Sequence, residues 1–183
     1  MNRFVRAYLA VALAAAAHAL PDESLYNLVS AWQDQAGRNL QLRQLSGRVE
    51  VLAMVYTHCQ SVCPAIIDAM QRTESSLTSR ERAQVGFVLV SIDPSVDTPG
   101  QLQEFAAQHH FGPGWTLLRG SPEDVRELAA TLNFKYRKTS QKDYAHSAMI
   151  SVLNQQGEIV QQQVGMSGGA EERLREIRKL LSK

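Results

Sequence analysis

The sequence of 183 residues contains only two cysteines, Cys59 and Cys63. Two thiols are too few for a disulfide-dense scaffold or for a zinc ribbon, which needs four thiolates. The chain also lacks an excess of positive charge, because 19 Lys and Arg side chains are offset by 18 Asp and Glu side chains. Without a basic surplus to neutralise phosphates, binding to nucleic acid is not expected. Repeats and low-complexity linkers are missing as well, so one globular domain is expected.

Long apolar runs are missing except near the N-terminus. There, two arginines precede an apolar stretch over residues 7–17, which ends in Ala17-His18-Ala19. This pattern is typical of a secretory signal peptide with a small-residue cleavage site. The stretch falls well short of the roughly 20 residues that a membrane-spanning helix requires, so a retained membrane anchor is the less favoured alternative. We expect cleavage after Ala19, a single mature domain over residues 20–183, and export to the periplasm.

Hydrophobic patterning predicts alternating strands and helices. Residues 49–56 and 85–92 are short apolar runs rich in β-branched residues, which is typical of strands buried on both faces. Two further strands, 147–153 and 158–164, are joined by a tight turn. Helices are expected over residues 64–77, 98–110, 121–134 and 170–181. This order combines a parallel βαβ unit with an antiparallel pair, and it predicts a thioredoxin-like α/β sandwich whose central mixed sheet is flanked by helices.

The two cysteines directly follow the first predicted strand, in the sequence Thr57-His58-Cys59-Gln60-Ser61-Val62-Cys63-Pro64. In open α/β sheets the working site lies at the carboxyl ends of the parallel strands. Pro64 disfavours a helical conformation at Cys63, so we expect Cys63 at the helix N-cap and Cys59 in the turn before it. The unpaired amides and the dipole of a helix N-terminus favour the thiolate. A reactive pair is therefore predicted rather than an inert bridge, which would close too short a loop to stabilise the fold much.

Two thiolates are soft ligands that select Cu(I) or zinc, and a site for either metal usually needs a third donor. His109 and His110 lie near the end of a polar helix, where no thiol is expected, so solvent exposure is predicted for both. His58 is adjacent to Cys59, but neighbouring residues of an extended chain point to opposite sides. His146 begins a strand that is expected to pair within the same sheet. Spacing therefore leaves His58 and His146 open as candidates and favours His146.

Several short motifs occur together in one order, and they carry a family resemblance. They are Tyr56-Thr57-His58-Cys59, Val62-Cys63-Pro64, Ser91-Ile92-Asp93-Pro94, Asp97-Thr98-Pro99, and Asp143-Tyr144 with His146-Ser147. Over about residues 40–181 the chain resembles the Sco/SenC family of copper-binding assembly factors for cytochrome c oxidase. The resemblance implies a copper site, for Cu(I), Cu(II) or both, formed by Cys59, Cys63 and His146. The chain departs from the family pattern at Gln60, where proline is frequent, and at Ala145, where an acid often precedes the histidine.

Other side chains near the predicted site allow more than one interpretation. Asp93 and Asp97 follow the second predicted strand, and they could form an acidic patch for a partner, an outer shell for the metal, or turn and cap interactions. Thioethers also bind Cu(I). Three of the methionines, Met54, Met70 and Met149, fit strand or helix patterns and are predicted to fill the core. Met166 is placed in a loop and is not counted as a ligand.

Two functions of different classes share the cysteines. A copper carrier, the favoured hypothesis, would receive copper from a periplasmic donor and pass it, as a monomer, to the copper-centre subunit of cytochrome c oxidase. A thiol-disulfide reductase would use Cys59 and Cys63 as its catalytic redox pair and would need a thiol reductant as partner. Thioredoxin-type oxidoreductases resemble one another in a proline before the third strand, and this chain has no proline after Pro122. A peroxiredoxin is disfavoured, because Leu52 and Tyr56 stand where that family's Pro and Thr or Ser would be.

Overall fold

The structure, a computed structural model, describes residues 19–140, 143–165 and 169–182. Its centre is a seven-stranded sheet in the order β2-β1-β5-β4-β3-β8-β9, and β6 and β7 form a separate two-stranded sheet. The strands are β1 (Trp32–Asp34), β2 (Asn39–Leu40), β3 (Val49–Val55), β4 (Val85–Ser91), β5 (Trp115–Gly120), β6 (Tyr136–Lys138), β7 (Tyr144–His146), β8 (Met149–Leu153) and β9 (Ile159–Val164). The helices are η1 (Leu25–Asn27), η2 (Leu42–Leu45), α1 (Cys63–Ser75), α2 (Ser79–Arg82), α3 (Pro99–Gln108), α4 (Pro122–Thr131) and α5 (Ala170–Leu181).

The middle of the sheet is parallel and its margins are antiparallel. Strands β3, β4 and β5 run parallel, with Val55 opposite Ser91 at the carboxyl ends of β3 and β4. Strand β8 pairs antiparallel with β3, β9 pairs antiparallel with β8, and β1 pairs antiparallel with β5. Every residue of β3 and β4 is buried, as their nearly continuous apolar runs predict. The predicted thioredoxin-like α/β sandwich is confirmed.

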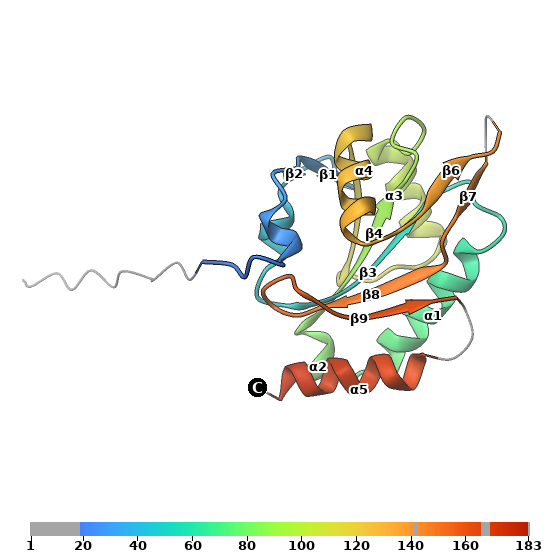
Figure 1. The fold of residues 1–183 in the computed structure, drawn as a ribbon. Coiled ribbons are helices and arrows are strands. Elements are labelled where there is room, and N and C mark those ends of the chain that lie inside the picture. The colour runs from blue at the N-terminus through green and yellow to red at the C-terminus, as the bar shows by residue number, and fades with distance from the viewer. Residues whose placement is uncertain (1–18, 141–142, 166–168, 183) are drawn as a thin grey trace, which may run out of the picture.

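The helices cover both faces of the sheet (Figure 1). Helix α1 is tied to α5 by Arg173, whose Nε donates to Thr73 Oγ1, and to the end of α3 by Gln71, whose Nε2 donates to the carbonyl of His109. Helices α1, α3 and α5 therefore share one face, as right-handed crossovers between parallel strands require. Helix α4 covers the opposite face, where Gln162 of β9 donates to the carbonyl of Leu132.

Sequence signals placed the helix starts well. Thr98 and Ser121 are N-cap residues whose hydroxyls accept from the amides of Gln101 and Asp124. Helix α1 begins one residue earlier than predicted, because Cys63 is its first residue and Val62 is the N-cap. Proline then occupies the second position of α1, where its missing N–H leaves no intrahelical bond unmade.

Three parts of the structure differ from the sequence-based prediction. Strand β5 separates the two middle helices, and the β1–β2 hairpin pairs with β5 in a segment that carried no strand signal. Strand β8 begins at Met149 rather than at residue 147, so His146 belongs to β7 of the separate hairpin and not to the main sheet. The predicted signal peptide lies outside the described residues except for Ala19. Within the described ranges, no helix combines the length and apolar character needed to cross a bilayer.

Candidate metal centre

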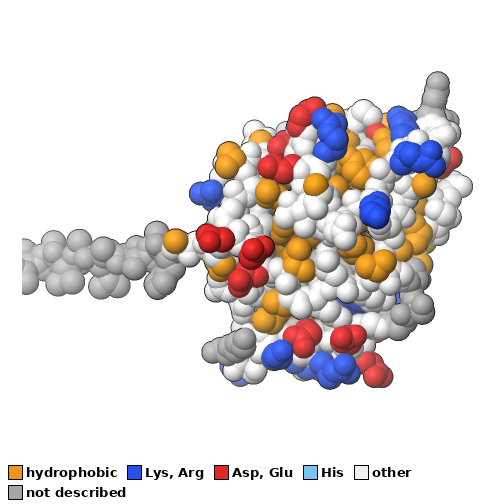
Figure 2. Space-filling view, viewed as in Figure 1, with side chains coloured by type: hydrophobic (Ala, Val, Ile, Leu, Met, Phe, Trp, Pro, Cys, Tyr) orange, Lys and Arg blue, Asp and Glu red, His pale blue; other side chains and the backbone are white. Residues whose placement is uncertain are grey.

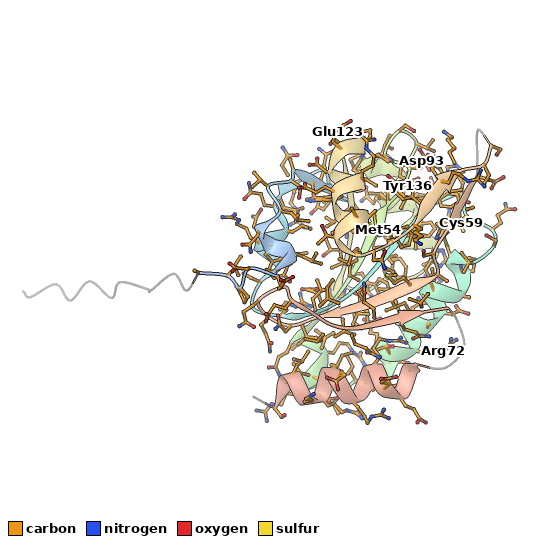
Figure 3. The ribbon with its side chains drawn as sticks, in the orientation of Figure 1. Met54, Cys59, Arg72, Asp93, Glu123 and Tyr136 are labelled. Atoms are coloured by element: carbon orange, nitrogen blue, oxygen red, sulfur yellow. The ribbon has the colours of Figure 1, made fainter. Side chains whose placement is uncertain are left out.

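The cysteines lie where β3 ends and α1 begins. After β3 the chain makes a turn in which the Cys59 amide donates to the carbonyl of Tyr56. The Cys63 amide, at the start of α1, donates to Cys59 Sγ at 3.3 Å. Cys59 is 8% exposed and Cys63 is 1% exposed, so only the first thiol reaches the surface. Figure 3 shows Cys59, Asp93 and Tyr136 toward one end of the sheet, with Arg72 away from them.

His146 completes a group of three possible metal ligands. Its Nε2 lies 3.5 Å from Cys63 Sγ and 3.9 Å from Cys59 Sγ. The three donor atoms all lie within 4.8 Å of one another, and among the described residues no fourth His, Cys, Asp or Glu joins them. The structure thus brings together the three side chains that the sequence nominated. The prediction that His146 belongs to the main sheet is wrong, because β7 instead pairs with β6 and places Tyr136 opposite His146.

The imidazole of His146 is oriented from behind. Its Nδ1 lies 2.9 Å from the carbonyl oxygen of Ser147, to which it donates a hydrogen bond. A proton on Nδ1 leaves the lone pair of Nε2 directed at the sulfurs, which is the arrangement that metal-binding histidines usually adopt. Ser147 is itself fixed, since its amide donates to the carbonyl of Lys135. Sequence analysis missed this role, which belongs to a backbone carbonyl and leaves no residue signature.

Aromatic rings surround the imidazole. Tyr56 meets the His146 ring edge-on with centroids 5.8 Å apart, and Phe134 lies at 5.8 Å on a tilted plane. Tyr144 packs on Tyr56 at 5.3 Å, and its amide donates to the Tyr56 hydroxyl. These rings hold His146 against the cysteine loop and keep water from most of its surface. Two of the three, Phe134 and Tyr144, occur within twelve residues of His146, which is the sequence signal that could have pointed to them.

The two thiols are electrostatically unequal. A hydrogen bond from the Cys63 thiol lowers the pKa of Cys59 to about 3, against the opposing effect of burial and with help from His146 and the Cys63 amide. The same hydrogen bond, together with burial, raises the pKa of Cys63. The pair therefore holds one proton and one negative charge at neutral pH, with the charge on Cys59. The Cys63 amide contributes as expected of a helix N-terminus, but the thiol hydrogen bond is the larger effect, and the pKa of Cys63, the first residue of α1, is raised.

Asp93 and Asp97 do not form an acidic surface patch. They are 4% and 0% exposed, so that alternative is wrong. Asp97 accepts from the Thr57 hydroxyl at 2.5 Å, from the Thr57 amide at 3.2 Å and from the Ser91 hydroxyl at 2.5 Å. It thereby fixes the first residue of the cysteine loop to the end of β4. Asp93 accepts from the hydroxyl of Ser95, which is the turn interaction that the sequence left open.

The other candidate side chains stay away from the sulfurs. His58 is exposed and contacts Thr57 Oγ1 through Nδ1. His110 is exposed as predicted, but His109 is half-buried and stacks on Phe111 with centroids 5.4 Å apart, so the expectation of solvent exposure is wrong for His109. Burial lowers the pKa of His109. The three core methionines Met54, Met70 and Met149 are buried as predicted, and Met166 lies outside the described residues.

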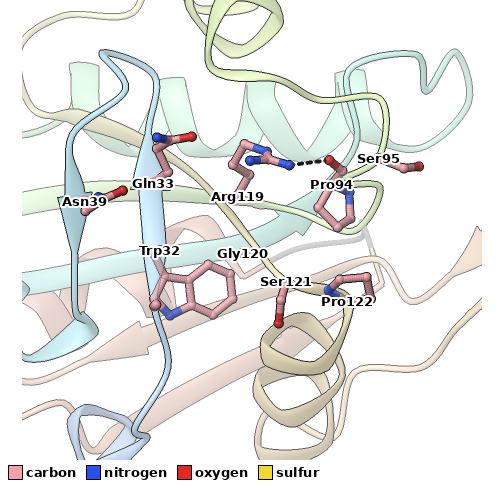
Figure 4. Close-up of a pocket in the computed structure, with 10 residues that line it drawn as sticks. Trp32, Gln33, Asn39, Pro94, Ser95, Arg119, Gly120, Ser121 and Pro122 are labelled. Carbon is pink, nitrogen blue, oxygen red and sulfur yellow. Dashed lines mark hydrogen bonds between the residues drawn. The ribbon is translucent and has the colours of Figure 1, made fainter.

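A separate hollow of about 460 Å³ lies beside the carboxyl end of β5 (Figure 4). Trp32 and Gly120 line its floor, and Arg119 crosses it to donate to the carbonyl of Pro94 at 2.7 Å. A Cβ at residue 120 would lie 2.9 Å from the Trp32 ring, so glycine makes room for the indole. The hollow contains neither thiol nor imidazole, and the metal-ligating group lies outside it.

Comparison with known proteins gives consistent matches. The family model described as SCO1/SenC matches residues 25–182. The "SCO1 protein homolog" of Bacillus subtilis (strain 168) is 31% identical over 105 residues, which are 57% of this chain and 54% of that protein. The chain thus spans little more than half the length of this curated relative.

Solved structures share the fold. A SCO1/SenC family lipoprotein from Bacillus anthracis str. Ames has a TM-score of 0.75 and 26% identity, covering 82% of this chain and 92% of that chain. Bradyrhizobium japonicum ScoI, solved with copper bound, has a TM-score of 0.71 and 22% identity, covering 82% of this chain and 96% of that chain. The family match spans both cysteines, His146 and every strand of the main sheet. On this match, the chain belongs to the SCO1/SenC family.

Proposed function

We propose that this protein binds one copper ion through Cys59 Sγ, Cys63 Sγ and His146 Nε2 and delivers it to another protein. The observation that carries the proposal is the spacing of the donors, with sulfur–nitrogen distances of 3.5 Å and 3.9 Å. Bond lengths of about 2.3 Å to sulfur and about 2.0 Å to nitrogen, in a trigonal arrangement, separate these atoms by roughly 3.7 Å. The residues present therefore fit a three-coordinate metal with little movement.

The donor set favours copper over a structural zinc ion. Structural zinc takes four ligands in a closed tetrahedron, whereas this group supplies three among the described residues. Two soft thiolates and an imidazole suit Cu(I), and a group of three ligands leaves a position for an incoming ligand. The copper-bound structure of Bradyrhizobium japonicum ScoI supports the same assignment.

Copper binding changes the protonation of the pair. The charge already resides on Cys59, so this sulfur is ready to bind a cation. Cys63 carries the remaining proton, which must leave before its sulfur can coordinate. Uptake through both sulfurs therefore releases the Cys63 proton. The hydrogen bond from His146 Nδ1 to the carbonyl of Ser147 leaves Nε2 as the nitrogen that faces the sulfurs.

For the recipient we propose the copper-centre subunit of cytochrome c oxidase, with a periplasmic copper donor upstream. The family resemblance supports this role, and the signal-like sequence at residues 1–19 supports export of the mature chain to the periplasm. An exported chain receives its metal outside the cytoplasm, where the thiols must be reduced before they can bind copper.

Thiol-disulfide reduction is the second candidate function, and the inequality of the thiols favours it. The Cys59 thiolate would attack one sulfur of a partner disulfide, forming a mixed disulfide and releasing the other sulfur as a thiolate. Cys63, after losing its proton to the released thiolate, would then attack Cys59 Sγ. This second step forms the Cys59–Cys63 disulfide and frees the second partner thiol. The chain is oxidised by two electrons and the partner is reduced by two, so an external thiol reductant must regenerate the pair.

Anaerobic titration of the reduced mature chain with Cu(I), and separately with Cu(II), tests the proposed function. We expect one copper ion per chain and a loss of affinity beyond the roughly 100-fold typical of outer-shell changes in Cys59→Ser, Cys63→Ser and His146→Ala. His58→Ala is the matched control, because it removes an exposed imidazole next to the same loop. Full affinity in His146→Ala would contradict the site.

A genetic comparison separates carrier from reductase. Both functions need the cysteines, whereas only copper transfer needs the imidazole. We expect a His146→Ala strain to lose oxidase activity as the double cysteine variant does, with partial recovery of both on added copper. Retained activity in His146→Ala, with rescue of the cysteine variant by an external thiol, would instead support the reductase.

A further inference from the structure

The hairpin that carries His146 also carries exposed positive charge. Lys135 precedes β6, and Arg137 and Lys138 lie within it, all three with exposed side chains. Among the described residues, none of the three takes part in an ion pair. Lys138 lies over the Tyr144 ring at 5.6 Å, so its charge stays close to the candidate site. Figure 2 shows Lys and Arg side chains gathered over the β6–β7 hairpin.

The register of the hairpin explains why Arg137 is unpaired. Tyr136 lies opposite His146, whereas Arg137 lies opposite Ala145 on the other side of the ribbon. A residue directly across an antiparallel pair has its Cβ about 5 Å away, so residue 145 is the natural position for a neutralising acid. Alanine there supplies no charge. The one described acid of the hairpin, Asp143, has its carboxylate directed to the Ser140 hydroxyl.

An open hollow of about 350 Å³ joins this charge to the candidate site. Lys135, Arg137, Ala145, Ser147, Tyr136 and His146 line it. The small Ala145 side chain fills little of the hollow, whose lining includes both the basic residues and His146. A protein that docked in this hollow would therefore meet two cations without an ion-pair partner among the described residues, Lys135 and Arg137, in the same hollow that His146 lines.

We propose that the hollow bounded by Lys135, Arg137 and Ala145 is the docking surface for an acidic region of the protein that exchanges copper with His146. This inference rests on the proposed function and adds the chemistry of the partner. Complementary charge raises the rate of encounter and fixes orientation more than it raises affinity, and exposed pairs of this kind are screened by salt. The basic residues of this docking surface thus govern how fast copper is exchanged, while the three ligands govern how tightly it is held.

Two synthetic peptides serve as probes in the first test. Both contain the same Cys-x3-Cys copper-binding pair, which is flanked by glutamates in one and by lysines in the other. The Cu(I)-loaded chain is mixed with each peptide in a stopped-flow instrument at increasing salt. We expect transfer to the glutamate peptide to be about tenfold faster at low salt and to lose this advantage at high salt. Equal rates for the two peptides would overturn the proposal.

The variants are chosen to alter the face without altering the ligands. Ala145→Glu places a carboxylate across from Arg137 and should slow transfer to the glutamate peptide, while Ala145→Gln, of the same size, should not. Arg137→Glu should slow it further. Arg43→Glu, the same charge change on exposed η2, is the matched control and should leave the rate near that of the wild type. Equal slowing by Ala145→Gln or Arg43→Glu would contradict a specific face.

A second measurement keeps this inference separate from the proposed function. The metal-free chain is titrated with the glutamate peptide whose cysteines are replaced by serine, and amide chemical shifts are recorded. Shifts confined to residues 135–138 and 143–147 would support the docking surface even if the chain failed to bind copper. Shifts spread over the molecule, or equal shifts with the lysine peptide, would overturn it. Copper affinity in Ala145→Glu should match the wild type, since a changed affinity would place the effect at the ligands instead.

Discussion

An acidic group is buried near each end of β3, and the pKa values of the two groups are shifted in opposite directions. At the amino end Glu50 is 2% exposed, and burial raises its pKa from 4.5 to about 7. Past the carboxyl end Cys59 is 8% exposed, and the hydrogen bond from Cys63 lowers its pKa to about 3. Two groups near the ends of one strand are therefore buried to a similar extent, yet their pKa values shift in opposite directions.

The difference lies in the neighbours that each group meets. Cys59 receives hydrogen bonds from the Cys63 thiol and the Cys63 amide, and both favour its charged form. Glu50 lies where Gly86 leaves room, since a Cβ at residue 86 would collide with its carboxyl group. The attraction of Arg48 offsets the burial of Glu50 only in part. Burial alone thus favours the neutral acid, and donors aimed at the charged form reverse that preference.

Removing the donor from Cys63 should have the largest effect on this comparison. Cys63→Ala takes away the strongest influence on Cys59, so we expect the pKa of Cys59 to rise from about 3 toward its ordinary value of 9.0. Each unit above the working pH lowers the thiolate fraction tenfold, so alkylation of Cys59 near pH 5 should slow by at least about tenfold. Thiolate ultraviolet absorbance against pH gives the pKa directly. Ser61→Ala is the control, because it removes another polar contact to the same sulfur, at 3.7 Å, and keeps the Cys63 thiol in place. An unchanged Cys59 pKa in Cys63→Ala would show that the helix amide suffices.

Glu50 should make the free energy of unfolding depend on pH. Its pKa is higher in the folded chain, so the folded state retains a proton that the unfolded state releases. The stabilisation is complete below pH 4.5 and is lost as pH rises through about 7, by about 3 kcal/mol. Glu50→Gln cannot ionise, so its stability should exceed that of the wild type above pH 7 and lack this decline. Urea denaturation of both metal-free chains across this range provides the measurement. Parallel curves would mean that Glu50 is not the titrating group.

The sequence alone was enough to locate the elements that carry a local hydrophobic or capping signal. Strands β3 and β4 are nearly continuous apolar runs, and α3 and α4 open on Thr98 and Ser121 caps, so both kinds of element could be located from local signals. Strands β6 and β7 have the sequences YRK and YAH, which carry no such signal, because these strands pair with each other outside the core. Their existence depends on tertiary contacts, which patterning does not describe.

The candidate site was predictable in its ligands and not in its surroundings. Cys59 and Cys63 follow a buried strand, and the family resemblance identified His146 as the third ligand. The carbonyl of Ser147 that orients the imidazole is a backbone group, and the hairpin that places His146 had no strand signal. The sequence also left Asp97 open among several roles, because its partner Thr57 lies 40 residues away along the chain.

Asp97 is intermediate between Glu50 and Cys59. It is a buried acid that accepts hydrogen bonds, and burial nonetheless raises its pKa. Asp97→Asn replaces one acceptor oxygen with an amide that faces the donors of Thr57 and Ser91. We expect the free energy of unfolding at neutral pH to fall by about 1–3 kcal/mol, because buried donors lose their acceptor. Copper affinity should fall by about tenfold as the start of the cysteine loop loosens. Denaturant unfolding and Cu(I) competition measure the two effects. A stable variant with a wild-type loop would assign Asp97 no positioning role.

The smallest effect is expected at His58, which adjoins Cys59 in sequence but is exposed. Its Nδ1 contacts Thr57 Oγ1, and among the described residues it is not part of the ligand group. Exposed substitutions away from special contacts change stability by no more than about 0.5 kcal/mol, so copper affinity in His58→Ala should stay within about twofold of the wild type. His146→Ala, at a half-buried imidazole fixed by Ser147, provides the contrast under the same Cu(I) competition assay. A loss in His58→Ala comparable to that in His146→Ala would mean that the cysteine loop turns to bring a second imidazole to the metal. The conclusion that buried hydrogen-bond donors determine the chemistry of the cysteine pair would then need revision, because an exposed group would be setting that chemistry.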